Sequence, residues 1–267
     1  MSAPDFPALL ADLAAEEAAL DRVVADLEPA AWATPTPAEG WDVRDSIAHL
    51  AWTEDLAVLA LRDPGAFVVQ RDEVLAAGVD DVLLGDGRAM PGVAVRDWWR
   101  QSRASVRREL ATRDGRDRIV WITGPIAVMS FATARLMETW AHGLDVRAAL
   151  GLGPEASARL RHVADLGVRT RRFAYETRGR PEPVTPVRVE LVAPDGASWA
   201  WGETRARDVV RGSALDFCLV VTQRINPDDT ALVVDGDAAR DWIGIAQAFA
   251  GPPSEHRPAR STGRSAP

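Results

Sequence analysis

Apolar residues recur at helical spacing in four long stretches of the N-terminal part of the chain. Residues 7–27 carry leucine and valine on one face and acidic residues on the other, which is the pattern of an amphipathic helix. The same spacing predicts helices over residues 41–61, 95–112 and 131–150, with Asp42 and Ser130 as N-terminal caps. A shorter helix is expected over residues 67–77. Four long helices joined by uneven loops indicate a four-helix bundle.

The pattern changes after the glycine-rich stretch at residues 151–154. One more helix is expected over residues 156–175, followed by a proline-rich linker. Strand-like runs then cover residues 187–192, 198–201 and 231–234, with helices over residues 213–222 and 238–249. We therefore predict an α+β protein with an N-terminal bundle (1–151) and a smaller C-terminal α/β domain (152–250). The polar, proline-rich tail (251–267) is expected to be disordered.

Candidate chemistry begins with Glu138 and His142, which are four residues apart on the last bundle helix. Residues at this spacing project from one face, so a carboxylate and an imidazole can hold one metal ion together. A second histidine, His49, lies in another bundle helix and completes a possible three-ligand site. Two imidazoles and one carboxylate suit catalytic zinc, but also iron(II), manganese or nickel. The competing interpretation of Glu138 and His142 is an ordinary surface ion pair.

Composition narrows the choice of chemistry. The formal net charge of −8 argues against a nucleic-acid or anionic-membrane partner, because both require a basic face. The chain has no lysine and a single cysteine, Cys218, which excludes Schiff-base lysine chemistry, an intramolecular disulfide and a thiolate metal cluster. The N-terminus has the pattern of neither a signal peptide nor a membrane span, so a cytoplasmic location is expected. No H-E-x-x-H motif occurs, which argues against a peptidase.

Two segments resemble the DinB-like metalloprotein superfamily: TPAEGWDVRDSIAHLAWTED and, about ninety residues later, METWAHGLDVRAALG. They are most similar to the branch of mycothiol-dependent maleylpyruvate isomerases and their two-domain relatives. The resemblance implies a DinB-like bundle that binds a divalent metal, with zinc as the expected ion, through His49, Glu138 and His142. The segment GSALDFCLVVTQRINPDDTALVVDGD resembles the C-terminal, sterol-carrier-like domain of that branch. The resemblance therefore covers nearly the whole chain.

The same resemblance implies that the thiol of mycothiol is the nucleophile and that the substrate is a small electrophile. It also implies that Arg224 reaches from the C-terminal domain to an anionic substrate, although a surface arginine is the alternative. Asp45, one turn before His49, is a candidate for accepting a hydrogen bond from the ring nitrogen of His49 that does not face the metal. Asp145 is the corresponding candidate for His142. For both aspartates a solvated surface acid is the competing interpretation. Trp41 and Trp140 are candidates for the walls of the site.

Three functions remain open from the sequence. The first is a metal-dependent transferase or isomerase that uses a low-molecular-weight thiol. The second is a metal-dependent hydrolase or lyase of a small metabolite. The third is a non-catalytic binding protein in which the metal is structural and the C-terminal domain carries an apolar ligand. A fourth protein ligand at the metal would favour it, since structural zinc sites are closed. A monomer or a homodimer is expected.

Overall fold

The structure, a computed structural model, describes residues 5–77 and 85–259. The chain forms two compact units, residues 1–155 and 156–267. The boundary suggested by the sequence lies after residue 151. The first unit is helical apart from one short hairpin, and the second contains a four-stranded sheet. The predicted α+β class is therefore confirmed. No helix among the described residues is both long enough and apolar enough to cross a membrane.

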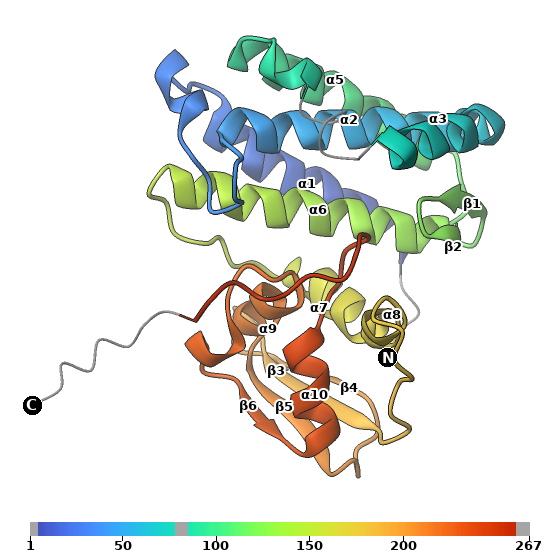
Figure 1. Ribbon diagram of the computed structural model, residues 1–267, viewed down its shortest axis with the longest axis vertical. Helices are drawn as coiled ribbons and strands as arrows, with labels where there is room; N and C mark the ends of the chain where they lie inside the picture. Colours follow the sequence, from blue (N-terminus) through green and yellow to red (C-terminus); the bar gives the residue numbers. More distant parts are fainter. Residues whose placement is uncertain (1–4, 78–84, 260–267) are drawn as a thin grey trace, which may run out of the picture. The chain divides into compact units, whose positions relative to one another are not determined.

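The first unit is built on four long helices, as predicted (Figure 1). They are α1 (Phe6–Val24), α2 (Val43–Arg62), α5 (Gly92–Leu110) and α6 (Val128–Ala149). Helix α2 packs against α5 and α6, while α1 packs against α6 and α5. The remaining elements are the 3-10 helix η1 (Pro29–Ala33), helix α3 (Pro64–Ala77) and a hairpin of β1 (Arg118–Trp121) and β2 (Gly124–Ala127).

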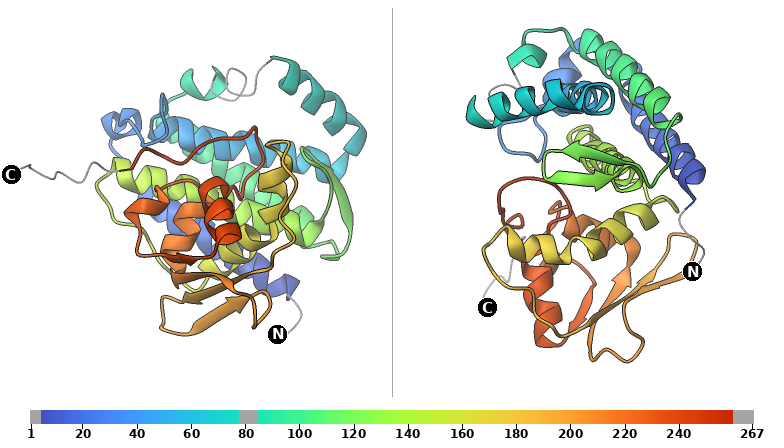
Figure 2. Two further views of the ribbon diagram at one scale, coloured as in Figure 1. Left: turned by 60° about the horizontal axis from the view of Figure 1, so that its bottom comes forward. Right: turned by 90° about the vertical axis from the view of Figure 1, so that its right-hand side faces the viewer.

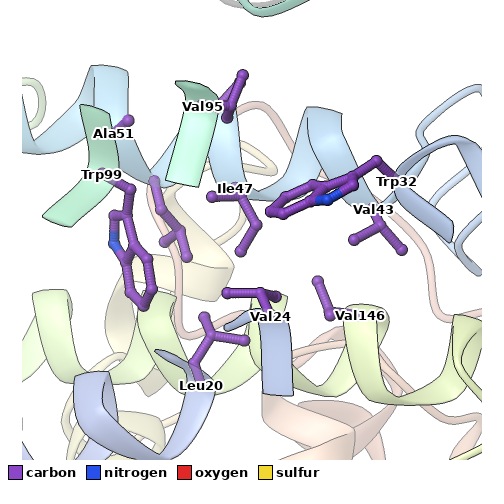
Figure 3. Close-up of a cluster of buried hydrophobic side chains, with 11 residues drawn as sticks. Leu20, Val24, Trp32, Val43, Ile47, Ala51, Val95, Trp99 and Val146 are labelled. Atoms are coloured by element: carbon purple, nitrogen blue, oxygen red, sulfur yellow. The ribbon is translucent and has the colours of Figure 1, made fainter. Parts of the chain in front are cut away.

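A cluster of buried apolar side chains joins all four helices (Figure 3). It contains Leu20, Val24, Trp32, Val43, Ile47, Ala51, Val95, Trp99 and Val146 among others. Tight packing is visible at the start of α5, where a Cβ added to Gly92 would lie 2.1 Å from the ring of Trp32. Any larger residue at that position would displace Trp32. The cluster fixes the relative positions of α2 and α6, which carry the candidate ligands.

The start of α6 differs from the sequence prediction. Ser130 was expected to be the N-terminal cap, but the helix begins at Val128 and has no side-chain cap. The hairpin region supplies the missing acceptors, because the N–H groups of Val128 and Met129 donate to the carbonyls of Asp117 and Gly115 at 2.8 and 2.9 Å. Backbone carbonyls thus satisfy helix-terminal donors that a serine side chain usually satisfies.

The second unit packs helices against a mixed sheet whose strand order is β4-β3-β5-β6 (Figure 2). The strands are β3 (Val187–Val192), β4 (Ser198–Trp201), β5 (Asp208–Ser213) and β6 (Val233–Asp235). Strand β3 pairs in parallel with β5, and the other pairs are antiparallel. The helices are α7 (Leu160–Arg169), α8 (Arg171–Glu176), α9 (Ala214–Val221) and α10 (Asp237–Ile245), with the 3-10 helix η2 (Pro227–Asp229) before β6.

Two elements of this unit depart from the predictions. The helix expected over residues 156–175 is divided into α7 and α8 at Thr170, whose hydroxyl donates to the carbonyls of Leu166 and Gly167. Such a bond favours a bend, and the backbone of Thr170 leaves helical geometry, with φ −86° and ψ 6°. Strand β5 was not predicted at all, although it is a central strand of the sheet. It runs directly into α9, and its sequence, DVVRGS, does not alternate regularly.

The segment that follows residue 250 is held by hydrogen bonds as far as the structure describes it. The Gln247 side chain donates to the carbonyl of Pro252 at 3.1 Å, and the Asn226 side chain donates to that of Arg257 at 2.8 Å. Disorder was expected here because the composition is polar and proline-rich. Hydrogen bonds from side-chain amides therefore hold this segment. Residues 260–267 of the expected tail lie outside the described residues.

Candidate metal centre

The start of α2 is fixed by a reciprocal cap. The carboxylate of Asp42 accepts a hydrogen bond from the N–H of Asp45 at 2.8 Å, and that of Asp45 accepts one from the N–H of Asp42 at 3.2 Å. This capping box confirms Asp42 as the N-cap and places His49 on the second turn of the helix.

Asp45 does not hold His49 as the sequence suggested. Its carboxylate also accepts hydrogen bonds from Arg88, at 2.8 and 3.0 Å, and Nδ1 of His49 has no hydrogen-bond partner among the described residues. The correction has a simple cause: an aspartate at the third position of a helix is at the correct distance to close the capping box. Asp45 therefore stabilises the helix that carries His49, and does not contact its imidazole.

Helix α6 is buried on almost every side, so it presents Glu138 and His142 to the bundle interior. The oxygen Oε2 of Glu138 lies 3.5 Å from Nε2 of His142 and 3.8 Å from Nε2 of His49. One ligand atom from each residue can be chosen so that all three lie within 4.8 Å of one another. Two helices far apart in sequence therefore bring the three predicted ligands together.

These distances fit a metal better than a hydrogen-bonded cluster. Zinc binds imidazole nitrogen and carboxylate oxygen at about 2.0 to 2.2 Å, so two ligand atoms of a tetrahedral site lie roughly 3.4 Å apart. The separations of 3.5 and 3.8 Å are close to that value and too long for good hydrogen bonds. Among the described residues, the group of potential ligands has three members. A tetrahedral ion held by these three residues would have one position left for an exogenous group.

The charge states of the ligands also suit a divalent ion. Burial would raise the pKa of the Glu138 carboxyl, but the imidazoles of His142 and His49 and the charge of Arg135 outweigh it and hold this pKa well below its usual value. Burial, assisted by the neighbouring His142, lowers the pKa of His49 to about 4. An ionised carboxylate and a neutral imidazole are the forms that bind metal.

Trp41 forms one wall of the site. Its ring is stacked on that of His142, with centroids 5.7 Å apart, and is tilted against that of His49 at 5.3 Å. Trp140 is not part of this wall, because a residue two positions after Glu138 projects from the opposite side of the helix. It lines a separate small pocket together with Leu20.

Asp145 lies behind His142. Its Oδ2 is 3.8 Å from Nδ1 of His142, the ring nitrogen that does not face Glu138, and its side chain is 1% exposed. A carboxylate at that nitrogen is the usual partner of a metal-binding imidazole. This placement is consistent with the predicted positioning role of Asp145. At 3.8 Å the two atoms are ion-pair neighbours and are too far apart for a hydrogen bond.

Sequence reasoning missed a buried ion pair next to the ligands. Arg135, three residues before Glu138, has a side chain that is 4% exposed, and its Nη1 lies 3.9 Å from Oε1 of Glu54 on α2. The guanidinium also lies over the rings of Trp121 and Phe131. Three-residue spacing from Glu138 was the available signal for Arg135, but its partner on another helix could not be read from spacing.

The remaining candidates belong to the second unit. Arg224 follows α9 and donates to the carbonyl of Thr222 at 2.8 Å. Its predicted role toward a substrate stays a prediction. Cys218 is fully buried in α9, and burial raises the pKa of its thiol well above the usual value, so this cysteine is a core residue, as expected.

Comparisons with known proteins concern the family and the fold of the chain. Residues 13–147 match the family model described as the mycothiol maleylpyruvate isomerase N-terminal domain. Uncharacterised proteins from two strains of Mycobacterium tuberculosis are each 44% identical over 252 residues, which cover 93% of this chain and 97% of the relative.

Solved structures share the fold. The crystal structure of the mycothiol-dependent maleylpyruvate isomerase has a TM-score of 0.56 at 16% identity, covering 85% of this chain and 94% of that one. A histidine-to-alanine mutant of that isomerase has a TM-score of 0.57 at 15% identity, with the same coverage. At this identity the likeness concerns the fold, and it extends over both units of the chain.

Proposed function

The chain belongs to the mycothiol maleylpyruvate isomerase family, and from that premise we propose that it is a metal-dependent enzyme that uses a low-molecular-weight thiol, such as mycothiol. Zinc is the proposed metal, and His49, Glu138 and His142 are the proposed ligands. The substrate is a small electrophile. The thiol either promotes its isomerisation or is transferred to it. The single observation that carries the proposal is the convergence of these three side chains at metal-ligand separations.

Each residue of the site has a proposed task. The imidazoles of His49 and His142 offer Nε2, and Glu138 offers a carboxylate that offsets part of the charge of a divalent ion. When bound, such an ion is a Lewis acid that lowers the pKa of a thiol or a water at its open position. The Trp41 ring, which covers both imidazoles, limits access of bulk water from that side.

The proposed isomerisation requires no nucleophile from the protein, because the thiol forms and then breaks the only new bond. The thiol loses its proton to solvent, its sulfur adds to a conjugated double bond, and the electron pair moves onto the activating carbonyl group. Rotation about the resulting single bond and expulsion of the sulfur restore the double bond and the thiolate. The buried Cys218 is not needed for any step.

A carboxylate on the substrate would give Arg224 a function. A guanidinium binds a carboxylate through two parallel hydrogen bonds. We propose Arg224 as that partner, on the basis of the family resemblance alone. Arg224→Met is expected to raise the KM for a carboxylate-bearing substrate, while the KM for an uncharged electrophile such as a bimane stays unchanged.

Conjugate formation tests the proposed chemistry. Zinc-loaded protein is incubated with mycothiol and a bimane electrophile, and the thioether is measured against the uncatalysed rate. We expect acceleration that disappears in metal-free protein and in Glu138→Gln, and that persists in Cys218→Ala, the matched control for the protein's own thiol. Absence of acceleration with zinc-loaded protein would contradict the thiol-dependent function.

A metal-dependent hydrolase or lyase is the second candidate, because three protein ligands leave a position that suits water as well as a thiol. Turnover of a small ester by the zinc-loaded protein, without any added thiol, would favour this candidate.

A further inference from the structure

We infer that Glu54 is a positioning residue of the metal centre: it holds the Arg135 guanidinium away from Glu138, so that the Glu138 carboxylate stays open to a metal. The inference rests on the proposed function, because it takes His49, Glu138 and His142 as the ligands. It concerns two side chains that do not themselves offer a ligand atom to the site.

Arg135 is a permanent charge inside the bundle. Its side chain is 4% exposed, and its guanidinium lies 5.6 Å from the ring centroid of Trp121 and 5.9 Å from that of Phe131. Two of its nitrogens, Nε and Nη1, have no hydrogen-bond partner among the described residues. A guanidinium keeps its proton inside proteins, so this buried charge requires an anion close by.

Two carboxylates compete for that charge. Glu54 is the nearer one, with Oε1 at 3.9 Å from Nη1 of Arg135. Glu138 lies one turn further along the same face of α6, and its ion-pair partners in the described structure are the two imidazoles. An arginine that loses its pairing with Glu54 can turn toward Glu138. An arginine–carboxylate pair would then compete directly with the metal for the same oxygens.

Glu54 is well placed to prevent this competition. It lies on α2, five residues after His49, so one helix delivers both a ligand and the anion for Arg135. Its side chain is 2% exposed, and its second oxygen, Oε2, has no hydrogen-bond partner in the described part of the chain. Burial raises the pKa of Glu54 to about 7, against the opposing charge of Arg135, so Glu54 is mostly ionised at pH 8.

Glu17 on α1 provides a matched control. It is also a buried glutamate with a side chain 2% exposed, and its Oε2 also lacks a hydrogen-bond partner in the described structure. Its ion-pair partner is Arg107, at 3.3 Å, and not Arg135. Glu17→Gln therefore removes a buried carboxyl group of the same kind without releasing the guanidinium next to Glu138.

The test is the zinc affinity of the full chain at pH 8, measured by competition with a chelator. We expect Glu54→Gln to bind zinc about tenfold or more weakly, the scale seen when a residue supporting a metal ligand is lost. Glu17→Gln should stay within about twofold of wild type. The double variant Glu54→Gln/Arg135→Met should regain the wild-type affinity, because it lacks the competing guanidinium. Unfolding temperatures of the metal-free proteins check that each variant is folded.

Each result decides the inference. Unchanged affinity in Glu54→Gln would overturn it, and so would a double variant that binds as weakly as Glu54→Gln, since Glu54 would then act independently of Arg135. If Glu54→Gln does not fold, Arg135→Met decides alone: it should bind zinc at least as tightly as wild type, and a tenfold loss would refute the inference. Failure of the wild type to bind zinc would instead remove the proposed function, and the inference with it.

Discussion

Two polar clusters of this protein, one half-exposed and one inside the bundle, show how differently a carboxylate can be paired. In the second unit, the hydroxyl of Tyr175 donates to Asp241 at 2.9 Å, and Arg180 donates to both oxygens of the same carboxylate at 2.7 and 2.8 Å. In the bundle, Glu138 lies 3.5 and 3.8 Å from two imidazoles whose Nδ1 atoms have no hydrogen-bond partner among the described residues.

The distances between polar atoms distinguish the two clusters. The Asp241 cluster closes at ordinary hydrogen-bond lengths and needs no further group. The Glu138 cluster has the spacing expected around a central ion, and incomplete pairing continues next to it at Arg135 and Glu54. Buried polar groups are normally paired, so a concentration of incompletely paired ones in one part of a bundle is a signature of a site.

The largest expected effect is stabilisation by metal. Zinc at a thousandfold excess over its Kd should raise the free energy of unfolding by about 4 kcal/mol, because an ion that binds only the folded state shifts the equilibrium by mass action. The measurement is denaturant unfolding of metal-free protein with and without zinc. Asp241→Asn should show the same increment, because its cluster closes without a metal, whereas Glu138→Gln should show almost none. An equal zinc-induced increase in the free energy of unfolding in all three proteins would contradict the distinction between the clusters.

A smaller effect is expected from pH. Burial and the charge of Glu54 raise the pKa of Glu17 to about 8 from the 4.5 of an ordinary glutamate. Between these values the folded state holds a proton that the unfolded state has lost, so stability should fall as pH rises, at about 1.4 kcal/mol per pH unit for one such group.

Unfolding of metal-free protein between pH 5.5 and 7.5 measures this dependence. Glu17→Gln should make the slope shallower by about 1.4 kcal/mol per pH unit, since glutamine does not titrate. The contribution of Glu54, whose pKa burial also raises, to about 7, should remain. A slope that is unchanged in the variant would show that the carboxyl group of Glu17 is better compensated than its surroundings suggest.

The smallest effect concerns the closed cluster. Tyr175→Phe removes one hydrogen bond to a carboxylate and should lower the free energy of unfolding by about 1 to 2 kcal/mol. Zinc affinity should remain that of the wild type, because this cluster contains none of the proposed ligands. In the variant, Arg180 still pairs with the Asp241 carboxylate. A change in zinc affinity would contradict the separation of the two clusters.

The sequence predicted the helices well because their apolar periodicity is long and regular. The spacing of Glu138 and His142 pointed to one helix face, and the family pattern supplied His49 as the third residue. Interactions between elements were harder to predict. The roles of Asp45 in the capping box and of Glu54 opposite Arg135 depend on which groups reach one another in three dimensions.

The missed strand and the divided helix have local causes. Strand β5 carries no clear alternation, because it is a central strand that is buried along its first half. Thr170 fits a helical pattern in sequence, and only its backbone dihedrals, φ −86° and ψ 6°, reveal the break.

The central claim is that His49, Glu138 and His142 bind one metal ion together. Metal analysis of purified protein after loading with zinc and removal of excess tests it directly. We expect close to one equivalent per chain for the wild type and for His162→Ala, a control histidine in the second unit, and a loss of nearly one equivalent in His142→Ala. Equal zinc contents in wild type and His142→Ala would contradict it.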